Sequence, residues 1–149
     1  MDAERPPYSI TTDPARIDFD VVYGFLSQSY WATGIPRETM AKAIAGSLCF
    51  SLFKGTDQIG FARVITDRAT FAYLADVFVL EGHRAAGLGT WFMSVLFAHP
   101  DLQRLRRFQL ATRDAHGLYR KFGFNAPKKP EMLMEIVTSA AELYGTLEP

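Results

Sequence analysis

The segment FAYLADVFVL, residues 71–80, followed directly by EGHRAAGLGT, residues 81–90, decides the fold. Its first half is apolar at both alternating sets of positions, which is typical of a central strand covered by helices on both faces. Its second half contains two glycines, and from Leu88 onward apolar residues recur three and four positions apart, as in an amphipathic helix. A strand, a glycine-containing loop and a helix in this order predict an α/β fold.

The sequence on either side of this segment predicts the other elements of a mixed sheet with helices on its faces. We expect further strands at residues 8–11, 48–54, 58–66, 107–112 and 132–137. We expect helices at residues 19–29, 36–45, 88–98, 115–122 and 139–147, the first of them capped by Asp18. No repeat or linker divides the chain, and 149 residues suit one domain, so residues 1–149 are interpreted as a single domain.

Composition and charge argue against several classes of protein. Aromatic residues make up 13% of the chain, which excludes disorder, and sixteen basic side chains balance sixteen acidic ones, which counts against a nucleic-acid partner. Cys49 is the only cysteine and no Cys–His ligand spacing is present, so we expect no metal site and a reducing, cytoplasmic setting. The N-terminal residues do not resemble a signal peptide, and no apolar stretch reaches the ~20 residues that span a bilayer, so we expect no membrane partner.

The loop between the central strand and its helix has the properties of an anion-binding site. The first N–H groups of a helix have no intrahelical partner, and the helix dipole attracts negative charge to them. Gly87 and Gly89 would let the backbone approach a phosphate closely, and Arg84 adds a positive charge at the mouth of the loop. The alternative is that the two glycines only permit close packing of the helix on the strand.

Two motifs in this order are similar to those of a known family. Arg84-x-x-Gly87-x-Gly89 resembles the acetyl-CoA pyrophosphate loop of the GNAT superfamily of N-acetyltransferases, and AHGLYRKFGF at residues 115–124 resembles the second signature of that family. The resemblance covers about residues 8–137. It implies a GNAT-like fold, with a central, mostly antiparallel, splayed sheet and helices on both faces.

The resemblance implies where acetyl-CoA would bind. In this family the strand before the loop splays from its neighbour, and its free backbone groups, here those of Phe78 and Val79, bind the pantetheine arm. The pyrophosphate would lie on the backbone of Arg84, Ala85, Ala86, Gly87, Leu88, Gly89 and Thr90. Thr112 stands where the family often has Asn, and it is a further candidate cofactor contact. The basic residues Arg120, Lys121, Lys128 and Lys129 are candidates for the 3′-phosphate, or else form a solvated face.

The second signature supplies a candidate catalytic residue. When an amine attacks a thioester, the leaving thiolate gains charge, and a phenol at the sulfur can donate a proton or a hydrogen bond to it. Tyr119 stands at the signature position for this role. The alternative is that Tyr119 is only a packed aromatic residue beside Phe122 and Phe124.

Asp76 is the one charged residue of the predicted central strand, so its side chain needs a partner or a role. It is our first candidate for the base or the ammonium anchor, and Glu81 is the second. The alternative is a carboxylate paired with a backbone N–H or with Arg63 on the neighbouring strand. Tyr30 and Trp31 lie in the loop that in this family helps to form the acceptor site, so they either contact the substrate or pack at its rim.

These residues together predict an N-acetyltransferase that moves an acetyl group from acetyl-CoA to a primary amine of a small molecule or peptide. We expect direct attack in a ternary complex, because Cys49 is more typical of a buried small hydrophobe than of a nucleophile. Two alternatives are a non-catalytic acyl-CoA-binding or sensing module and a plain interaction domain. A homodimer is a reasonable expectation for the assembly.

Overall fold

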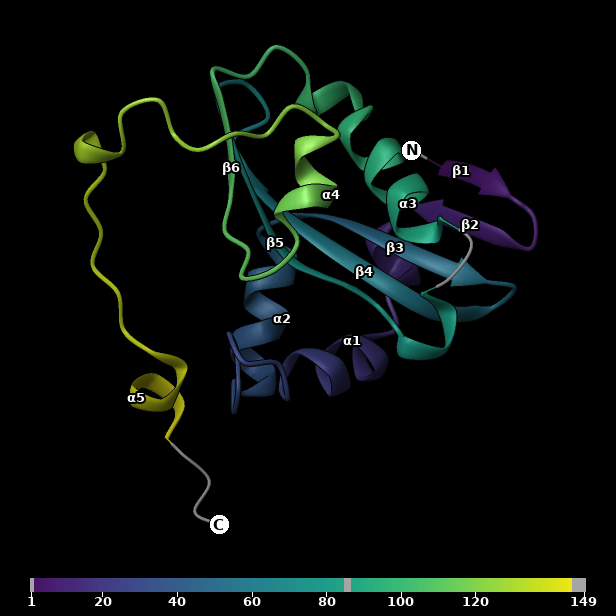
Figure 1. Ribbon diagram of the computed structural model, residues 1–149. Coiled ribbons are helices and arrows are strands. Elements are labelled where there is room, and N and C mark those ends of the chain that lie inside the picture. The colour runs from purple at the N-terminus through teal and green to yellow at the C-terminus, as the bar shows by residue number, and fades with distance from the viewer. Residues whose placement is uncertain (1, 85–86, 146–149) are drawn as a thin grey trace.

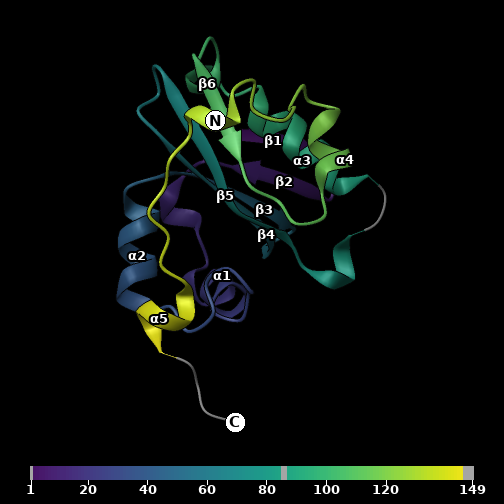
Figure 2. The ribbon, with the colours of Figure 1, turned by 60° about the vertical axis from the view of Figure 1, so that its left-hand side comes forward.

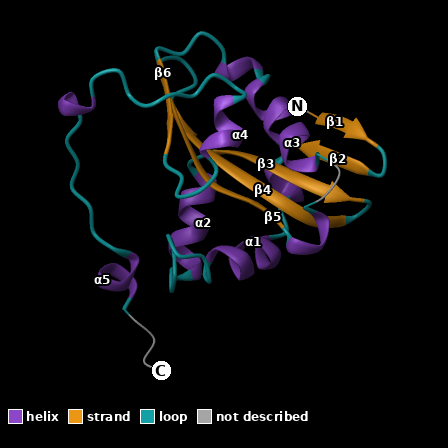
Figure 3. Cartoon of the chain, in the orientation of Figure 1, coloured by secondary structure: helices purple, strands orange, loops and turns teal. Residues whose placement is uncertain are grey.

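The computed structural model describes residues 2–84 and 87–145, and the strands of this part of the chain form one six-stranded sheet in the order β1 to β6 (Figure 1 and Figure 3). They are β1 (Asp2–Arg5), β2 (Tyr8–Thr11), β3 (Leu48–Lys54), β4 (Asp57–Thr66), β5 (Phe71–Val79) and β6 (Arg107–Leu110). Neighbouring strands from β1 to β5 are antiparallel, whereas β5 and β6 are parallel. The expected mixed, mostly antiparallel sheet is therefore confirmed.

Helices cover both faces of this sheet (Figure 2). One face carries α1 (Phe19–Leu26) and α2 (Arg37–Ala45), the other carries α3 (Leu88–Phe97) and α4 (His116–Arg120), and α5 (Ala140–Tyr144) lies near the C-terminus. Single 3-10 turns occur at Pro14–Arg16, Glu81–His83, Pro100–Leu102 and Pro130–Met132. The carboxylate of Asp18 accepts the Val21 N–H at 3.3 Å, so the predicted cap of the first helix is confirmed.

Each face of the sheet has its own apolar core. The core under α3 and α4 contains Ile10, Leu48, Phe50, Leu52, Ile59, Ala62, Val64, Ala72, Leu74, Leu88, Phe92, Met93, Leu96, Leu102 and Tyr119. The core under α1 and α2 contains Val22, Leu26, Ala32, Ile35, Met40, Cys49, Phe61 and Phe78. Burial on both faces explains why β3, β4 and β5 lack the simple apolar–polar alternation of half-exposed strands.

A bulge in β5 changes the face to which its side chains point. The register of β5 against β4 shifts between Ala75 and Phe78, and Asp76 between them has a φ of 53°, a left-handed value that Asp and Asn adopt more readily than most residues. Leu74 packs in the α3 core, whereas Phe78 packs in the α1–α2 core. Without the extra residue of the bulge, alternation would place these two side chains on the same face.

Beyond the first half of β5, the strands β5 and β6 separate. Their parallel ladder joins residues 71–74 of β5 to residues 107–110 of β6, and the second half of β5 continues to Val79 without this partner. The expected splay is therefore present, and it begins next to the bulge at Asp76. The two irregularities lie together and leave one edge of β5 open where the strand approaches α3.

Some predicted elements differ from the structure. The strand predicted at residues 132–137 is wrong, because the chain there leaves the body and forms no ladder with any described residue (Figure 1). Strand β1 was not predicted, since its sequence DAER is polar and it lies at the edge of the sheet. The first helix, the strand at 107–112 and the helix at 115–122 are each shorter than predicted. Among the residues that the structure describes, every helix is too short or too polar to cross a bilayer.

Candidate functional site

The N-terminus of α3 has the geometry expected of an anion site. Gly87 precedes the helix with a φ of 68°, in the left-handed region that favours glycine. The Trp91 N–H bonds to the Gly87 carbonyl, so the amides of Leu88, Gly89 and Thr90 have no intrahelical acceptor. Apart from the neighbouring residues and the backbone of α3 itself, no atom of the described residues lies within 4 Å of a Cβ built at Gly87 or at Gly89. Close packing therefore does not explain either glycine, and the open space beside them suits the approach of a ligand.

Arg84 connects this loop to the open edge of β5. Its Nε donates to the carbonyl oxygen of Val79 at 2.7 Å. The Leu80 N–H donates to the Ile59 carbonyl in β4, so alternation along the strand turns the backbone groups of Val79 away from β4, toward the side that β6 has left. The Arg84 side chain thus satisfies one of the backbone acceptors that were predicted to bind the pantetheine arm.

Tyr119 presents an unpaired phenol inside the α3 core. Only 7% of the residue is exposed, and burial raises the pKa of its hydroxyl above the ordinary value of 10.0. The ring packs edge-on against Phe124, with 6.1 Å between the centroids. Among the described residues its hydroxyl has no hydrogen-bond partner. The predicted contact with Phe124 is confirmed, and it leaves a protonated donor group that no neighbour uses.

The remaining predicted cofactor residues have mixed outcomes. The Thr112 hydroxyl accepts the Ala115 N–H at 3.0 Å, so it holds the turn that precedes α4, and a cofactor contact there stays a prediction. The Phe78 ring stacks on Phe25 in the α1–α2 core, with 4.1 Å between the centroids, and a backbone role for Phe78 also stays a prediction. Ala85 and Ala86 lie outside the described residues. The basic side chains proposed for the 3′-phosphate, Arg120, Lys121, Lys128 and Lys129, are exposed.

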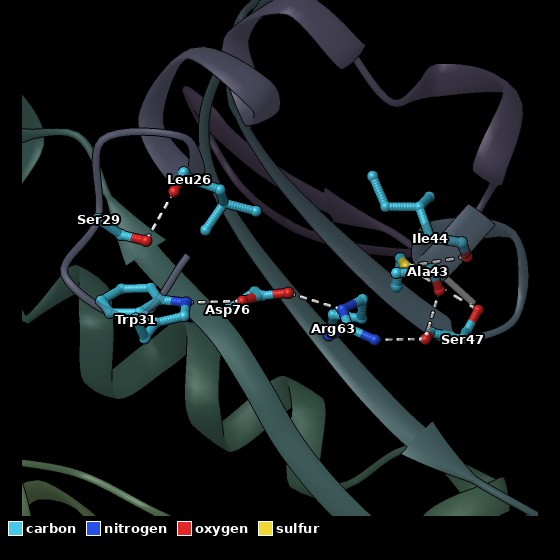
Figure 4. A network of polar contacts seen from close by, with 9 residues as sticks. Leu26, Ser29, Trp31, Ala43, Ile44, Ser47, Arg63 and Asp76 are labelled. Carbon is cyan, nitrogen blue, oxygen red and sulfur yellow. Dashed lines mark hydrogen bonds and ion pairs between the residues drawn. The ribbon is translucent and has the colours of Figure 1, made fainter. Parts of the chain in front are cut away.

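Asp76 lies at the centre of a polar network on the α1–α2 face (Figure 4). Its Oδ2 accepts from Arg63 Nε at 2.7 Å, and its Oδ1 accepts from Trp31 Nε1 at 2.7 Å. Only 8% of Asp76 is exposed, and the Arg63 side chain is also mostly buried. The alternative reading of Asp76, as the partner of Arg63 on the neighbouring strand, is therefore confirmed as its pairing. Its role as base or ammonium anchor stays a prediction.

The network continues from the sheet to the end of α2. Arg63 Nη1 donates to the Ser47 hydroxyl at 3.1 Å, and that hydroxyl donates to the Ala43 carbonyl at 2.7 Å (Figure 4). The loop between α1 and α2 is thus joined through Trp31 and Asp76 to the bulge of β5, and through Arg63 to the C-terminal end of α2. Every buried charge in this chain of contacts has a partner, as a low dielectric requires.

A second contact joins the same loop to the segment after β6. The guanidinium of Arg113 lies over the ring of Tyr30, with 3.9 Å from Cζ to the centroid. Tyr30 and Trp31 are adjacent, with their rings edge-on at 5.0 Å, so Trp31 contacts β5 and Tyr30 contacts the segment that follows β6. Sequence reasoning placed Tyr30 and Trp31 near a substrate but missed Arg113, because nothing local marks an exposed arginine as the partner of a distant aromatic ring.

Three other candidate groups have different outcomes. Glu81 is exposed in the turn after β5, and its role as an acceptor contact stays a prediction. Burial raises the pKa of the Cys49 thiol from 9.0 to about 12, so it is protonated near neutral pH and unsuited to act as a nucleophile. Within residues 2–84 and 87–145, no cluster of His, Cys, Asp and Glu side chains could hold a metal ion.

The region where β5 and β6 separate is bounded on its two sides by different kinds of group. On the α3 side it has the first amides of the helix and the phenol of Tyr119, whose hydroxyl has no hydrogen-bond partner among the described residues. On the α1–α2 side it has Trp31, bonded to the Asp76 carboxylate of β5, and Tyr30, which lies under the Arg113 guanidinium after β6. Such an arrangement can bind an anionic, phosphate-bearing molecule on one side and bring a second reactant to it from the other.

Comparisons with known proteins agree with this geometry. Residues 45–126 match the acetyltransferase (GNAT) domain family. A protein of Gibberella zeae assigned to the acetyltransferases is 33% identical over 138 residues, a match that covers 78% of this chain and 78% of that one.

Two solved structures extend the comparison. A Xanthomonas campestris pv. campestris protein assigned to the GNAT family is 48% identical, with a TM-score of 0.90 over 96% of this chain and 100% of that one. A Clostridium acetobutylicum protein assigned to the acetyltransferases, crystallised with acetyl-CoA, is 13% identical and has a TM-score of 0.62 over 92% of this chain and 96% of that one. At this identity the second comparison supports a shared fold alone.

Proposed function

Because this chain belongs to the GNAT family of acetyltransferases, we propose that it transfers the acetyl group of acetyl-CoA to a primary amine by direct attack in a ternary complex. One observation carries the proposal. Tyr119 and the N-terminus of α3 lie on one face of the sheet, and the aromatic loop that Asp76 holds lies on the other, where β5 and β6 part.

The residues around the α3 N-terminus fit the donor. Gly87 and Gly89 leave open space at the amides that would receive a pyrophosphate, and Arg84 adds a cation beside them. The open edge of β5 offers backbone groups of Val79, provided that the Arg84 side chain releases the carbonyl it now holds. The structural neighbour from Clostridium acetobutylicum with acetyl-CoA adds support for this class of donor.

Tyr119 would protonate or hydrogen-bond the leaving sulfur. Acetyl-CoA supplies a thioester, which breaks at its carbon–sulfur bond when a nitrogen–carbon bond forms. Because burial raises the pKa of Tyr119, its hydroxyl keeps the proton near neutral pH and can act as a donor. A group in this position contributes about 10²- to 10⁴-fold to a rate. No described residue competes for the proton.

The acceptor amine must arrive from the α1–α2 face and lose a proton. We propose Asp76 as the first candidate to anchor the ammonium or receive the proton, since each carboxylate oxygen can accept more than one hydrogen bond. Glu81, exposed after β5, is the second. Tyr30, Trp31 and Arg113 would form the rim through which the acceptor enters. The protonated thiol of Cys49 suits a reducing setting such as the cytoplasm.

The test combines a binding measurement and a turnover measurement. Acetyl-CoA and CoA should each raise the melting temperature of the purified protein, because a ligand that binds only the folded state stabilises it. Acetyl-CoA with a pool of primary amines should then release free thiol at a rate that depends on the amines, and mass spectrometry should identify the acetylated acceptor.

The controls separate the proposal from its alternatives. Omission of the amines should stop the thiol release, since no acyl-enzyme is expected. A shift in melting temperature without amine-dependent thiol release would favour a non-catalytic acyl-CoA-binding module. The absence of any shift with CoA would favour an interaction domain and overturn the proposal.

A further inference from the structure

The chain after α4 forms an apolar arm that touches almost nothing. We call residues 125–139 the C-terminal arm. Five of the six residues from Met132 to Val137 are large and apolar, yet Met134 is 96% exposed and Ile136 is 100% exposed. An exposed apolar run of this size marks a surface that another molecule covers. Residues 132–137 thus have the composition of a strand but pair with no described strand.

Both ends of the arm are fixed to the body of the protein. At its start, Phe124 packs against Phe97 and Phe108, with centroid distances of 5.3 Å and 5.5 Å. At its far end, Tyr144 of α5 packs at Gly34 in the loop between α1 and α2. Figure 1 shows the arm standing away from the sheet between these two points. The arm is thus held at both ends and exposed in between, on the side of the molecule where β6 lies.

Strand β6 offers a matching free edge. It is the last strand of the sheet, and its only ladder is the one with β5. Among the described residues nothing pairs with the other edge of residues 107–110, so a row of backbone donors and acceptors faces outward there. Such an edge readily adds a strand from another chain.

The arm and the edge match in both polarity and charge. Along residues 133–137 in an extended conformation, Met134 and Ile136 share one face, whereas Leu133, Glu135 and Val137 share the other. Along β6, the side chains of Phe108 and Leu110 join the α3 core, so those of Arg107 and Gln109 point to the opposite face. In the register that places Met134 and Ile136 on the face of Phe108 and Leu110, the Glu135 side chain lies on the face of Arg107, together with Leu133 and Val137.

A recess beside β6 adds a place for one of these apolar side chains. It has a volume of about 320 Å³. Its lining residues are Phe97, Leu102, Phe108, Phe122, Gly123, Phe124 and Asn125. Methionine is flexible and polarizable, and it suits an irregular pocket lined by aromatic rings. Phe108 lines the recess, so the recess is on the face that Met134 and Ile136 would adopt in this register.

We propose that the arm of one copy of this chain pairs with the free edge of β6 in a second copy, and that the second arm does the same in return. Both halves of the contact lie on one chain, so a two-fold dimer satisfies both at once and leaves neither arm nor edge exposed. The chain's own arm stands clear of its own edge. The expected homodimer thus gains a specific interface, which is independent of the proposed catalysis.

The oligomeric state tests the proposal. Light scattering with size-exclusion chromatography should find a dimer at micromolar concentration. The double substitution Met134→Asp and Ile136→Asp should weaken dimerisation roughly tenfold or more, because it places charges in the interface. These side chains are exposed in one copy, so the variant should still fold, which circular dichroism checks. Leu143→Asp, at an exposed apolar residue of α5, is the matched control and should remain dimeric. A monomeric wild-type protein overturns the proposal.

Cysteine cross-linking separates exchange between copies from pairing within one chain. Gln109→Cys in β6 is combined with Leu133→Cys, Glu135→Cys or Val137→Cys, which share the face of Gln109 in the proposed pairing. Cys49 is buried, and its raised pKa keeps it out of the exchange. Mixing a protein that has only the β6 cysteine with one that has only the arm cysteine should give a disulfide-linked dimer on a non-reducing gel. A cross-link that forms only within single chains of the doubly substituted protein shows an arm on its own edge and overturns the proposal.

Discussion

Trp31 donates a hydrogen bond from Nε1 to Oδ1 of Asp76 at 2.7 Å, and this bond fastens the loop between α1 and α2 to the bulge of β5. The two residues are 45 positions apart in the chain. The same carboxylate holds Arg63, so one buried group fixes a loop and a strand at the point where the sheet opens.

Trp31→Phe should loosen this loop without disturbing the donor side. The variant leaves Oδ1 of Asp76 without its indole partner, which costs about 1–3 kcal/mol of unfolding free energy for a buried polar group. We expect the KM for the acceptor to rise while the dissociation constant for acetyl-CoA stays the same. Steady-state kinetics and calorimetry measure the two quantities. Tyr30→Phe keeps the ring under Arg113 and is the matched control. If Trp31→Phe and the wild type had equal stability and equal acceptor KM, the Trp31–Asp76 hydrogen bond would not be what holds this loop.

Asp76 and Arg63 should be strongly coupled in stability. Asp76→Asn keeps a residue that tolerates the left-handed φ of 53° but leaves the Arg63 charge unpaired, and breaking a buried pair in this way costs about 3–5 kcal/mol. Arg63→Met should cost a similar amount. The double variant should lose less than the sum of the two, as measured by denaturant unfolding in a double-mutant cycle. Strictly additive losses would show that the pair contributes nothing as a unit.

Tyr119→Phe should separate chemistry from binding. Removal of the hydroxyl should lower kcat by about 10²- to 10⁴-fold. The dissociation constant for acetyl-CoA and the melting temperature should change little, because the hydroxyl has no partner among the described residues. Since burial raises the pKa of Tyr119, the wild-type kcat should persist until the pH exceeds about 10 and then fall. A phenylalanine variant with the kcat of the wild type across this range would rule out the donor role.

We expect the open space at Gly89 to be required for acetyl-CoA binding but not for the stability of the fold. Gly89→Ala introduces a Cβ that meets no atom within 4 Å, so the protein should fold and gain up to ~1 kcal/mol from helix propensity. Calorimetry should nevertheless show weaker acetyl-CoA binding, since the methyl group occupies space at the α3 amides. Gly24→Ala in α1, which also meets no atom within 4 Å, is the control and should bind as the wild type does. Equal affinity in both variants would remove Gly89 from the cofactor site.

Cys49 should make the stability of the protein depend on alkaline pH. Burial is the main cause that raises its pKa to about 12, against 9.0 for an exposed thiol. Above pH 9.0 the unfolded chain releases the thiol proton while the folded chain retains it, so the unfolding free energy falls as the pH rises toward 12. The slope from this group is at most about 1.4 kcal/mol per pH unit. Denaturant unfolding at about pH 8 and about pH 10 should show a flatter dependence in Cys49→Ala than in wild type.

The central strand, its loop and the following helix could be predicted because their signals are local. The apolar run of β5, the two glycines and the helical spacing after Leu88 each depend on neighbouring residues in the sequence. The same holds for the cap at Asp18 and for the position of Tyr119 in its signature. These features placed β5, the start of α3 and Tyr119 correctly along the chain, and the binding of a donor there stays a prediction.

The acceptor side could be predicted only in outline, because its contacts join distant parts of the chain. Trp31 meets Asp76, and Tyr30 meets Arg113, only after the sheet has formed. The bulge left no trace in the alternation, since β5 is apolar at both sets of positions. Residues 132–137 have the composition of a strand, but a strand forms only where a neighbour supplies its hydrogen bonds.

Because of the bulge at Asp76, the alternation of side chains between the two faces of the sheet changes phase within β5. Before the bulge, the even-numbered Ala72 and Leu74 face the α3 core, whereas after it the even-numbered Phe78 faces the α1–α2 core. Deletion of the single residue Asp76 would restore regular alternation along β5 and exchange the environments of Phe78 and Val79. The loop before α3 would then begin with the opposite edge of the strand facing β6. Sequence insertions and deletions should therefore be tolerated in the turn after β4 far better than anywhere between Leu74 and Arg84.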